Sequence, residues 1–345
     1  MEQLYAKGQV QVAAFGEFML RLHSGDSRRF LQAGEYKAYY AGAEANLSVL
    51  LARLGVSVRY ITRVPQNDIA MGGVEQLRGQ GVAVDHILYG GDKLALYFTE
   101  QGNGIRSTRV IYDRAGSSYA ELQPGMIDWD ACLSEVPYFH WSGIAAAVSQ
   151  GAADTCAEAL AAAHRKGMII SSDFNYRTSL WKYGKRPADV MPGLLQYSKV
   201  AVADLDSAAV YFGIETDGNA GFEERFVQCS RALQERLPLL EVLGMSFRRT
   251  EGIGHIYSGA LLYKGNCFFS PPYELPFVTD QIGSGDAFTG GMLYGLMNGS
   301  DPQRIITFAT ACGALKQSIV GDWAIISRSE IDQFIQSGSS GRIIR

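Results

Sequence analysis

The sequence predicts an α/β protein with a mainly parallel β-sheet and helices on both of its faces. Short apolar runs alternate with helical segments along most of the chain. Several predicted helices end at a glycine that precedes the next apolar run, as Gly55 and Gly167 do. Repeated β-α units of this kind cover both faces of a parallel sheet with helices, and they put the ligand site at the carboxyl ends of the strands.

In the first half of the chain the pattern alternates regularly and is then interrupted once. The predicted elements are a buried strand over 10–15, a half-exposed strand over 18–22, a helix over 42–54, a strand over 56–64, a helix over 68–80 and a strand over 82–88. Apolar runs at 94–99 and 107–113 flank Gly102-Asn103-Gly104 and predict a hairpin. The hairpin and the aromatic segment 29–40 fall outside the main pattern. We expect a small β-sheet lid formed by about 17–40 and 92–115.

The second half continues the alternation. The predicted elements are strands over 138–144, 168–173, 199–203 and 240–247, helices over 151–166, 188–197 and 223–235, and a hairpin around 264–266. Asp301-Pro302 supplies an N-cap and a first helical residue for a helix that runs to about 319. We expect residues 1–345 to form a single domain, with 337–345 as a loose tail.

Composition excludes several classes of function. The chain has 345 residues, 47% of them hydrophobic, which is enough for one large core. A net charge of −4 argues against a nucleic-acid partner, and no apolar run is long enough to span a membrane. The five cysteines are odd in number and lack a C-x-x-C pair, so we expect reduced thiols, no metal cluster and a cytoplasmic location.

The stretch 280–296 joins a glycine-rich turn to a helix and carries the strongest chemical signal. Gly283 and Gly285 allow successive amide N–H groups around Ser284 to face one point, and a helix N-terminus favours an anion there. Asp286 would repel a phosphate but would act as a base for a hydroxyl group that attacks it. The alternative is that Asp286 only completes the start of the helix, where acidic residues are common.

Three further glycines in this helix favour the chemical interpretation. Gly290, Gly291 and Gly295 each cost up to about 1 kcal/mol relative to alanine in a helix. We expect other elements to pack very close to this helix.

Three arginines stand near features expected at a site. Arg177 follows the strand 168–173, Arg114 closes the hairpin, and Arg248 follows the strand 240–247. Each alone would be interpreted as a surface charge, but together they suggest an anionic substrate beside a polyphosphate. The Walker A and protein-kinase motifs are absent, so a nucleotide must be bound in another way.

These residues resemble the PfkB/ribokinase family of carbohydrate kinases, over roughly residues 10–335. The segment 280–291 is similar to the family signature D-x-x-G-x-G-D-x-F-x-x-G. Further segments resemble the 2-keto-3-deoxygluconate kinase branch, namely 42–46, 97–98, 110–118, 173–181 and 315–322. The resemblance implies a ribokinase-like fold, ATP and Mg²⁺ as cofactors, a sugar acid as substrate, and a homo-oligomer formed through the lid.

The resemblance also implies residue roles. Asp286 would be the catalytic base, and Gly283, Ser284 and Gly285 the anion hole. The sugar-acid contacts would be Gly42, Asn46, Tyr97, Tyr112 and Arg114. Arg177 would bridge substrate and phosphates, while Ser246 and Arg248 would line the ATP site. Cross-strand aromatic packing is an equal alternative for the two tyrosines.

One departure from the family bears on turnover. The family has an asparagine motif that orders water and Mg²⁺ near residue 200, where this chain has Ala203-Asp204. We expect ATP-dependent phosphorylation of the terminal hydroxyl of a sugar acid, 2-keto-3-deoxygluconate, to its 6-phosphate. The alternatives are a kinase of another sugar, such as fructose or a nucleoside, and a catalytically weak regulatory relative that binds sugar acids.

Overall fold

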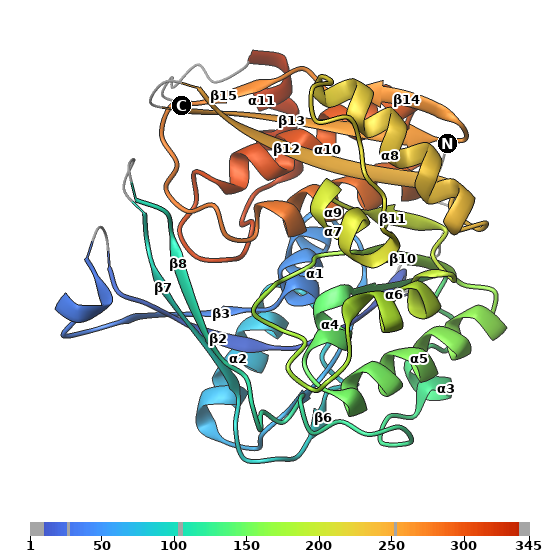
Figure 1. Ribbon diagram of the computed structural model, residues 1–345. Helices are drawn as coiled ribbons and strands as arrows, with labels where there is room; N and C mark the ends of the chain where they lie inside the picture. Colours follow the sequence, from blue (N-terminus) through green and yellow to red (C-terminus); the bar gives the residue numbers. More distant parts are fainter. Residues whose placement is uncertain (1–9, 26–27, 103–105, 252–253, 338–345) are drawn as a thin grey trace.

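A computed structural model describes residues 10–25, 28–102, 106–251 and 254–337. Its largest sheet has the strand order β14-β13-β12-β11-β10-β9-β1-β4, with β15 beside β13 (Figure 1). These strands are β1 (Val12–Phe15), β4 (Val58–Ile61), β9 (Tyr138–Ser142), β10 (Ile169–Asp173), β11 (Val200–Val202), β12 (Val242–Glu251), β13 (Gly254–Tyr263), β14 (Asn266–Phe269) and β15 (Tyr273–Leu275). From β4 to β12 all neighbours are parallel, and β13 to β15 add an antiparallel edge. The predicted mainly parallel sheet is confirmed.

Helices cover both faces of this sheet, as predicted. One face carries α1 (Ala43–Arg53), α2 (Asp68–Gly79), α9 (Ser284–Met297), α10 (Pro302–Lys316) and α11 (Arg328–Ser337). The other carries α3 (Trp129–Cys132), α4 (Gly143–Ala147), α5 (Gln150–Arg165), α6 (Pro187–Leu195), α7 (Leu205–Phe212) and α8 (Phe222–Arg236). Strand β1 separates the two cores, because Val12 and Ala14 point into the first while Ala13 and Phe15 point into the second.

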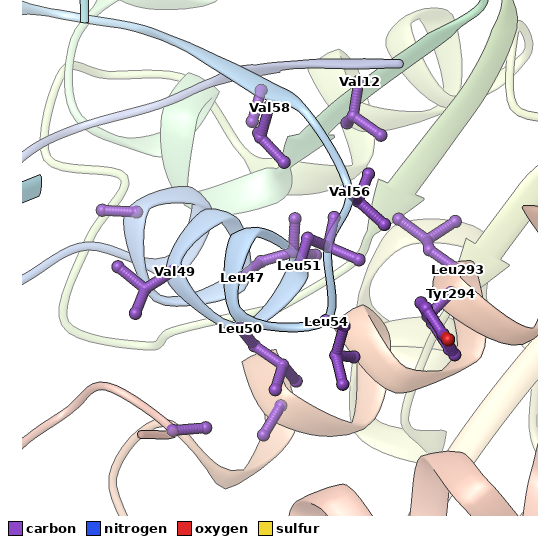
Figure 2. Packing of buried hydrophobic residues seen from close by; sticks show 14 of the residues in the cluster. Val12, Leu47, Val49, Leu50, Leu51, Leu54, Val56, Val58, Leu293 and Tyr294 are labelled. Atoms are coloured by element: carbon purple, nitrogen blue, oxygen red, sulfur yellow. The ribbon is translucent and has the colours of Figure 1, made fainter. Parts of the chain in front are cut away.

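Helix α9 lies between α1 and α10, and its glycines make the close approach possible. A Cβ on Gly290 would stand 3.1 Å from Leu50 of α1. One on Gly291 would stand 2.8 Å from the Sγ of Cys312 in α10. Figure 2 shows the leucines of α1 packed against the side of α9 that carries Leu293. The close packing expected around this helix is therefore present, and it fixes the direction of the α9 N-terminus.

A separate four-stranded sheet has the order β3-β2-β7-β8. Its strands are β2 (Met19–His23), β3 (Lys37–Ala41), β7 (Ala95–Glu100) and β8 (Arg109–Asp113), and the 3₁₀ helix Phe30–Gln32 lies between β2 and β3. Figure 1 shows this sheet beside the large one, at the left of the view. The small sheet and the β7–β8 pairing were predicted, whereas residues 103–105 of the predicted turn lie outside the described residues. That the sheet acts as a lid stays a prediction.

Some predicted elements differ from the structure. The strand expected over 82–88 is irregular: Ala83 makes an isolated parallel bridge to Arg59, and β6 (Leu88–Tyr89) pairs with β5 (Arg63–Val64). Its apolar residues Val82, Val84 and Ile87 are buried against the helical core, so their alternation reflects burial without a regular strand ladder. The strand over 138–144 ends two residues early, because helix α4 begins at Gly143.

The end of helix α10 differs from expectation, and α3, α4, α7 and α11 were not predicted. Helix α10 stops at Lys316, three residues before the predicted end. Ser337 is the last residue of α11, and the remainder of the predicted tail, 338–345, lies outside the described residues. All five cysteines are unpaired, as expected. No helix in the described part of the chain is long and apolar enough to cross a membrane.

Candidate active site

A cleft of about 690 Å³ lies where the small sheet meets the large one. Its walls include the ends of β10 and β11, the β7–β8 hairpin and the N-terminal turn of α9. All twelve residues that the sequence singled out as site candidates line this one cleft. A site at the carboxyl ends of parallel strands was expected from the fold. The structure therefore brings the candidates together, while the role of each stays a prediction.

The turn before α9 has a geometry that only glycine fits. Gly283 has a φ of 83°, and a Cβ there would overlap the carbonyl oxygen of Asp322. The carboxylate of Asp280 braces the turn by accepting the Ile282 N–H at 3.1 Å. In the first turn of α9 the amides have no acceptor within the helix, and the exposed Gly285 leaves this end open to the cleft. The turn is shaped to receive an anion.

Asp286 lies in this first helical turn with its side chain on the cleft. The Nδ2 of Asn46 donates to its Oδ2 at 2.6 Å, which joins the starts of α1 and α9. Burial raises the pKa of Asp286 to about 6, although the Asn46 hydrogen bond and the Arg177 charge act in the opposite direction. The buried Oδ1 of Asn46 has no hydrogen-bond partner among the described residues. Asp286 thus has the pKa of a base that works near neutral pH, and Asn46 has an acceptor free for a ligand hydroxyl.

Asp173 is a second acidic residue of the cleft that sequence reasoning missed. Burial, followed by the nearby Asp286 charge, raises the pKa of Asp173 to about 8. Its carboxyl group accepts the Asn175 N–H at 3.1 Å and the Thr289 hydroxyl at 3.3 Å. The sequence does show a carboxylate at the end of β10, and this position could have identified Asp173 as a site candidate. From this segment, however, only Arg177 was chosen as a candidate. The charge of Asp286 therefore disfavours ionisation of Asp173.

Arg114 carries unused hydrogen-bonding capacity into the cleft. Its side chain is only 5% exposed, and its Nη1 lies 3.3 Å from the carboxylate of Glu17. Its guanidinium lies 4.4 Å from the ring centre of Tyr112. Nevertheless its Nε and Nη1 donate no hydrogen bond within the described chain. Because a buried, unsatisfied guanidinium is costly, this geometry favours an anionic ligand such as a carboxylate.

Tyr97 and Tyr112 face each other across β7 and β8, with ring centres 5.9 Å apart. Both line the cleft, but the hydroxyl of Tyr97 donates to the carboxylate of Asp322. The two tyrosines therefore pack against each other across the strands, as the alternative interpretation expects, and they also line the cleft. Gly42 also lines the cleft at the start of α1, where a Cβ would overlap the carbonyl oxygen of Glu17.

The remaining candidates cluster around the α9 turn. Arg248 donates to Gln281 at 2.5 Å and to the Ser284 hydroxyl at 3.3 Å, so it already contacts the turn. Burial lowers the pKa of Arg248. Ser246 lies on the same strand and also lines the cleft. Arg177 is exposed and bonds the carbonyl of Tyr176 at 3.2 Å, leaving most of its guanidinium for a ligand.

Ala203 and Asp204 also line the cleft, at the end of β11. Ala203 is buried and presents only a methyl group. Asp204 caps α7, because its carboxylate accepts the Ser207 N–H at 2.6 Å. This part of the cleft wall therefore presents a methyl group and a carboxylate.

The fold and this cleft define an α/β protein with a mainly parallel sheet, a small second sheet and a ligand cleft at the carboxyl ends of the strands. The family model for pfkB family carbohydrate kinases matches residues 9–234 and 257–322. The chain therefore belongs to the pfkB family of carbohydrate kinases.

Individual relatives in this family are similar over nearly the whole chain. The 2-dehydro-3-deoxygalactonokinase of Haloferax volcanii is 29% identical, covering 96% of this chain and 98% of its own. The 2-dehydro-3-deoxygluconokinase of Thermoproteus tenax is 26% identical, covering 96% of each. The crystal structure of 2-dehydro-3-deoxygluconokinase from Thermotoga maritima aligns with a TM-score of 0.90 and 31% identity, over 95% of this chain and 99% of that one. These relatives are kinases named for dehydro-deoxy sugar acids.

Proposed function

We propose that this protein transfers the γ-phosphoryl group of ATP to the terminal hydroxyl of 2-keto-3-deoxygluconate and gives the 6-phosphate. The observation that carries the proposal is the pairing of two features in one cleft. Asp286 lies beside an anion-binding helix turn, and Arg114 offers unfilled guanidinium donors. The first feature suits phosphoryl transfer, and the second suits a substrate with a carboxylate. The names of the relatives agree with a sugar acid.

In this mechanism the acceptor hydroxyl lies between Asp286 and the α9 turn. Asp286 accepts the hydroxyl proton as the oxygen attacks phosphorus, and Asn46 holds the carboxylate in place through its 2.6 Å hydrogen bond. The amides of the first turn of α9 stabilise the charge on the transferring group. Arg177 neutralises charge between substrate and phosphates. Most of the catalysis is positioning and electrostatic stabilisation.

The residues present fit the nucleotide and its metal. Arg248 and the α9 turn supply donors for phosphate oxygens. Mg²⁺ keeps several waters and takes one or two carboxylates together with phosphates. The described residues include no cluster of three metal-ligating side chains, but Asp204 lines the cleft and would hold the ion through water. When bound, Mg²⁺ supplies positive charge to the phosphate groups.

An ADP-release assay coupled to a reporter enzyme tests the proposal. The panel should contain 2-keto-3-deoxygluconate, 2-keto-3-deoxygalactonate, fructose, ribose and adenosine, each with saturating Mg·ATP. We expect the highest kcat/KM for a keto-deoxy acid. A higher kcat/KM for a neutral sugar or for the nucleoside would contradict the sugar-acid proposal.

Replacement of Arg114 by alanine is expected to weaken the binding of sugar acids and not that of neutral sugars. A charge-assisted hydrogen bond contributes roughly 1.5–3 kcal/mol, so Arg114→Ala should raise KM for sugar acids by about 10- to 100-fold and leave the KM of neutral sugars unchanged. The matched control is Arg109→Ala, which removes an exposed arginine from β8, the strand just before Arg114, at a position that does not line the cleft. Equal losses for acids and neutral sugars would remove the assignment of Arg114 to a carboxylate.

The pH dependence should report Asp286. Because burial raises its pKa to about 6, the base is protonated below that pH, and kcat/KM for the sugar acid should fall as pH decreases through about 6. The Asn46 hydrogen bond lowers this pKa, so Asn46→Ala should move the midpoint to higher pH. A profile measured from pH 5 to pH 8 checks both directions. If the midpoint were unchanged in Asn46→Ala, the fall in kcat/KM at low pH would not be due to protonation of Asp286.

Ala203 motivates a second candidate function. The cleft lacks the family's asparagine amide at this position, which would weaken the ordering of water around Mg·ATP. A regulatory relative would bind sugar acids and turn over slowly. Calorimetric binding of 2-keto-3-deoxygluconate without ADP release at saturating Mg·ATP would favour this candidate.

We further propose that two copies associate through the small sheet. Leu31 is 98% exposed, and Tyr36 and Ile111 are exposed on the same substructure. Contact between these apolar groups would cover them. Light scattering during size-exclusion chromatography tests this proposal, since a mass near 37.6 kDa would indicate a monomer.

A further inference from the structure

A buried group of charges lies directly behind the anion-binding turn. It consists of Arg21, Asp280, Lys316 and Asp322, none more than 7% exposed. The Nη1 of Arg21 contacts the carboxylates of Asp280 and Asp322 at 2.7 Å and 3.0 Å. Arg21 comes from the small sheet, Asp280 from the turn before α9, Lys316 from the end of α10, and Asp322 from the segment that follows α10. Two positive and two negative side chains therefore balance one another behind the turn.

Lys316 holds two chain segments together at this place. It is the last residue of α10 and is completely buried. Its Nζ donates to the carbonyl oxygens of Asp280 and Ile319, each at 3.1 Å. A Cβ placed on Gly283 would stand only 3.3 Å from the Cε of Lys316. The lysine side chain thus lies against the back of the turn whose front faces the cleft.

Stability alone is a weak reason for an ammonium group in this position. Removal of a charge from water costs several kcal/mol, and buried ionic groups can often be replaced by apolar ones without loss of stability. Burial lowers the pKa of Lys316, while the charges of Asp280 and Asp322 act to raise it. The charge of Lys316 also acts to lower the pKa of Asp286, so its field reaches the cleft.

We propose that Lys316 is a positioning residue for phosphoryl transfer. Its ammonium group fixes the turn through the Asp280 carbonyl and supplies one of the two positive charges behind the anion site. This inference rests on the proposed kinase function. Without Lys316, Asp280 and Asp322 would face Arg21 alone, and the excess negative charge would repel phosphate. The turn would also lose its bond to the segment after α10.

Lys316→Met and Lys316→Gln test the inference. Methionine removes charge and donors but is also long and unbranched, whereas glutamine keeps a neutral donor. We expect kcat to fall by about 10²–10³ in Lys316→Met, as for loss of an oxyanion donor, with KM for the sugar acid within threefold of wild type. The kcat of Lys316→Gln should fall by a smaller factor. Lys199→Met, which removes a lysine from a surface ion pair with Glu241, should match wild type.

Chemical rescue separates the cation from mere packing. In Lys316→Ala, ammonium chloride should restore kcat at least tenfold, because a small cation can donate to the two vacated carbonyl oxygens. Tetramethylammonium chloride should not restore it. Equal restoration by both salts would overturn the inference, as would a folded Lys316→Met with kcat within threefold of wild type. If Lys316→Met does not fold, the kcat of Lys316→Gln and the rescue of Lys316→Ala test the inference by the same criteria.

Nucleotide binding distinguishes this inference from the proposed function. If the wild-type chain releases no ADP with any acceptor, the kinase proposal fails, and calorimetry with Mg²⁺ and the non-hydrolysable ATP analogue AMP-PNP still tests Lys316. Binding at least tenfold weaker in Lys316→Met supports the positioning role. Equal affinity in the two proteins, or no binding to either, overturns it.

Discussion

Asp286→Asn is expected to lower kcat by about 10²–10⁴, the contribution of a general base. Asparagine has nearly the same shape and can still accept the hydrogen bond from Asn46, but it cannot take the proton of the acceptor hydroxyl. Binding of Mg·ATP should change little, because the α9 turn and Arg248 stay in place. Steady-state ADP release gives kcat, and calorimetry with AMP-PNP gives the nucleotide affinity. The acidic limb of the pH profile should disappear with the carboxylate.

The matched control for this substitution is Asp206→Asn. Asp206 is also an acidic residue in the first turn of a helix, α7, but it is exposed and does not line the cleft. Loss of a favourable charge at a helix N-terminus should cost Asp206→Asn roughly 0.3–1 kcal/mol of stability, whereas Asp286→Asn should not lose stability in this way, because burial raises the pKa of Asp286 and so disfavours its charge. If Asp286→Asn turned over within threefold of Asp206→Asn, Asp286 would only start its helix.

The sequence predicts the layers of the fold well, because the sheet and its helices follow local periodicity. It fails where an apolar pattern has another cause. Residues 82–88 alternate like a strand, yet Val82 and Val84 are buried beneath helices without a continuous ladder. Helix α7 was missed although Asp204 and Ser207 form a capping box at its start. That signal is short, and the helix has only eight residues.

The site was predictable to the extent that its residues follow strand ends and the glycine turn. The charges that support it were not. Arg21 meets Asp280 across 259 residues of sequence, and nothing in either local segment indicates the pairing. Asp173 was visible as a strand-end carboxylate, but its pKa is raised first by burial and then by the charge of Asp286, which is distant in the sequence. Lys316 ends a helix, where a lysine is ordinarily interpreted as a favourable exposed charge.

Gly283→Ala is expected to lower kcat by at least about 10², the loss associated with one misplaced oxyanion donor. Gly283 has a φ of 83°, and a β-carbon there would overlap the carbonyl oxygen of Asp322. The left-handed conformation costs alanine about 1–2 kcal/mol. The overlap can be relieved only if the turn moves away from Asp322, and this movement displaces the first amides of α9. ADP release measures the loss of turnover.

Gly265→Ala separates the two effects in Gly283→Ala. Gly265 has nearly the same φ, 82°, but a β-carbon there would meet nothing within 4 Å. It lies in the turn between β13 and β14, outside the cleft. Both variants should lose similar stability from backbone strain, as a thermal melt would measure, while Gly265→Ala keeps the wild-type kcat. If Gly283→Ala kept a kcat within threefold of Gly265→Ala, the amides before α9 would not be the groups that stabilise the transferring phosphoryl group, and the anion site would have to lie elsewhere in the cleft.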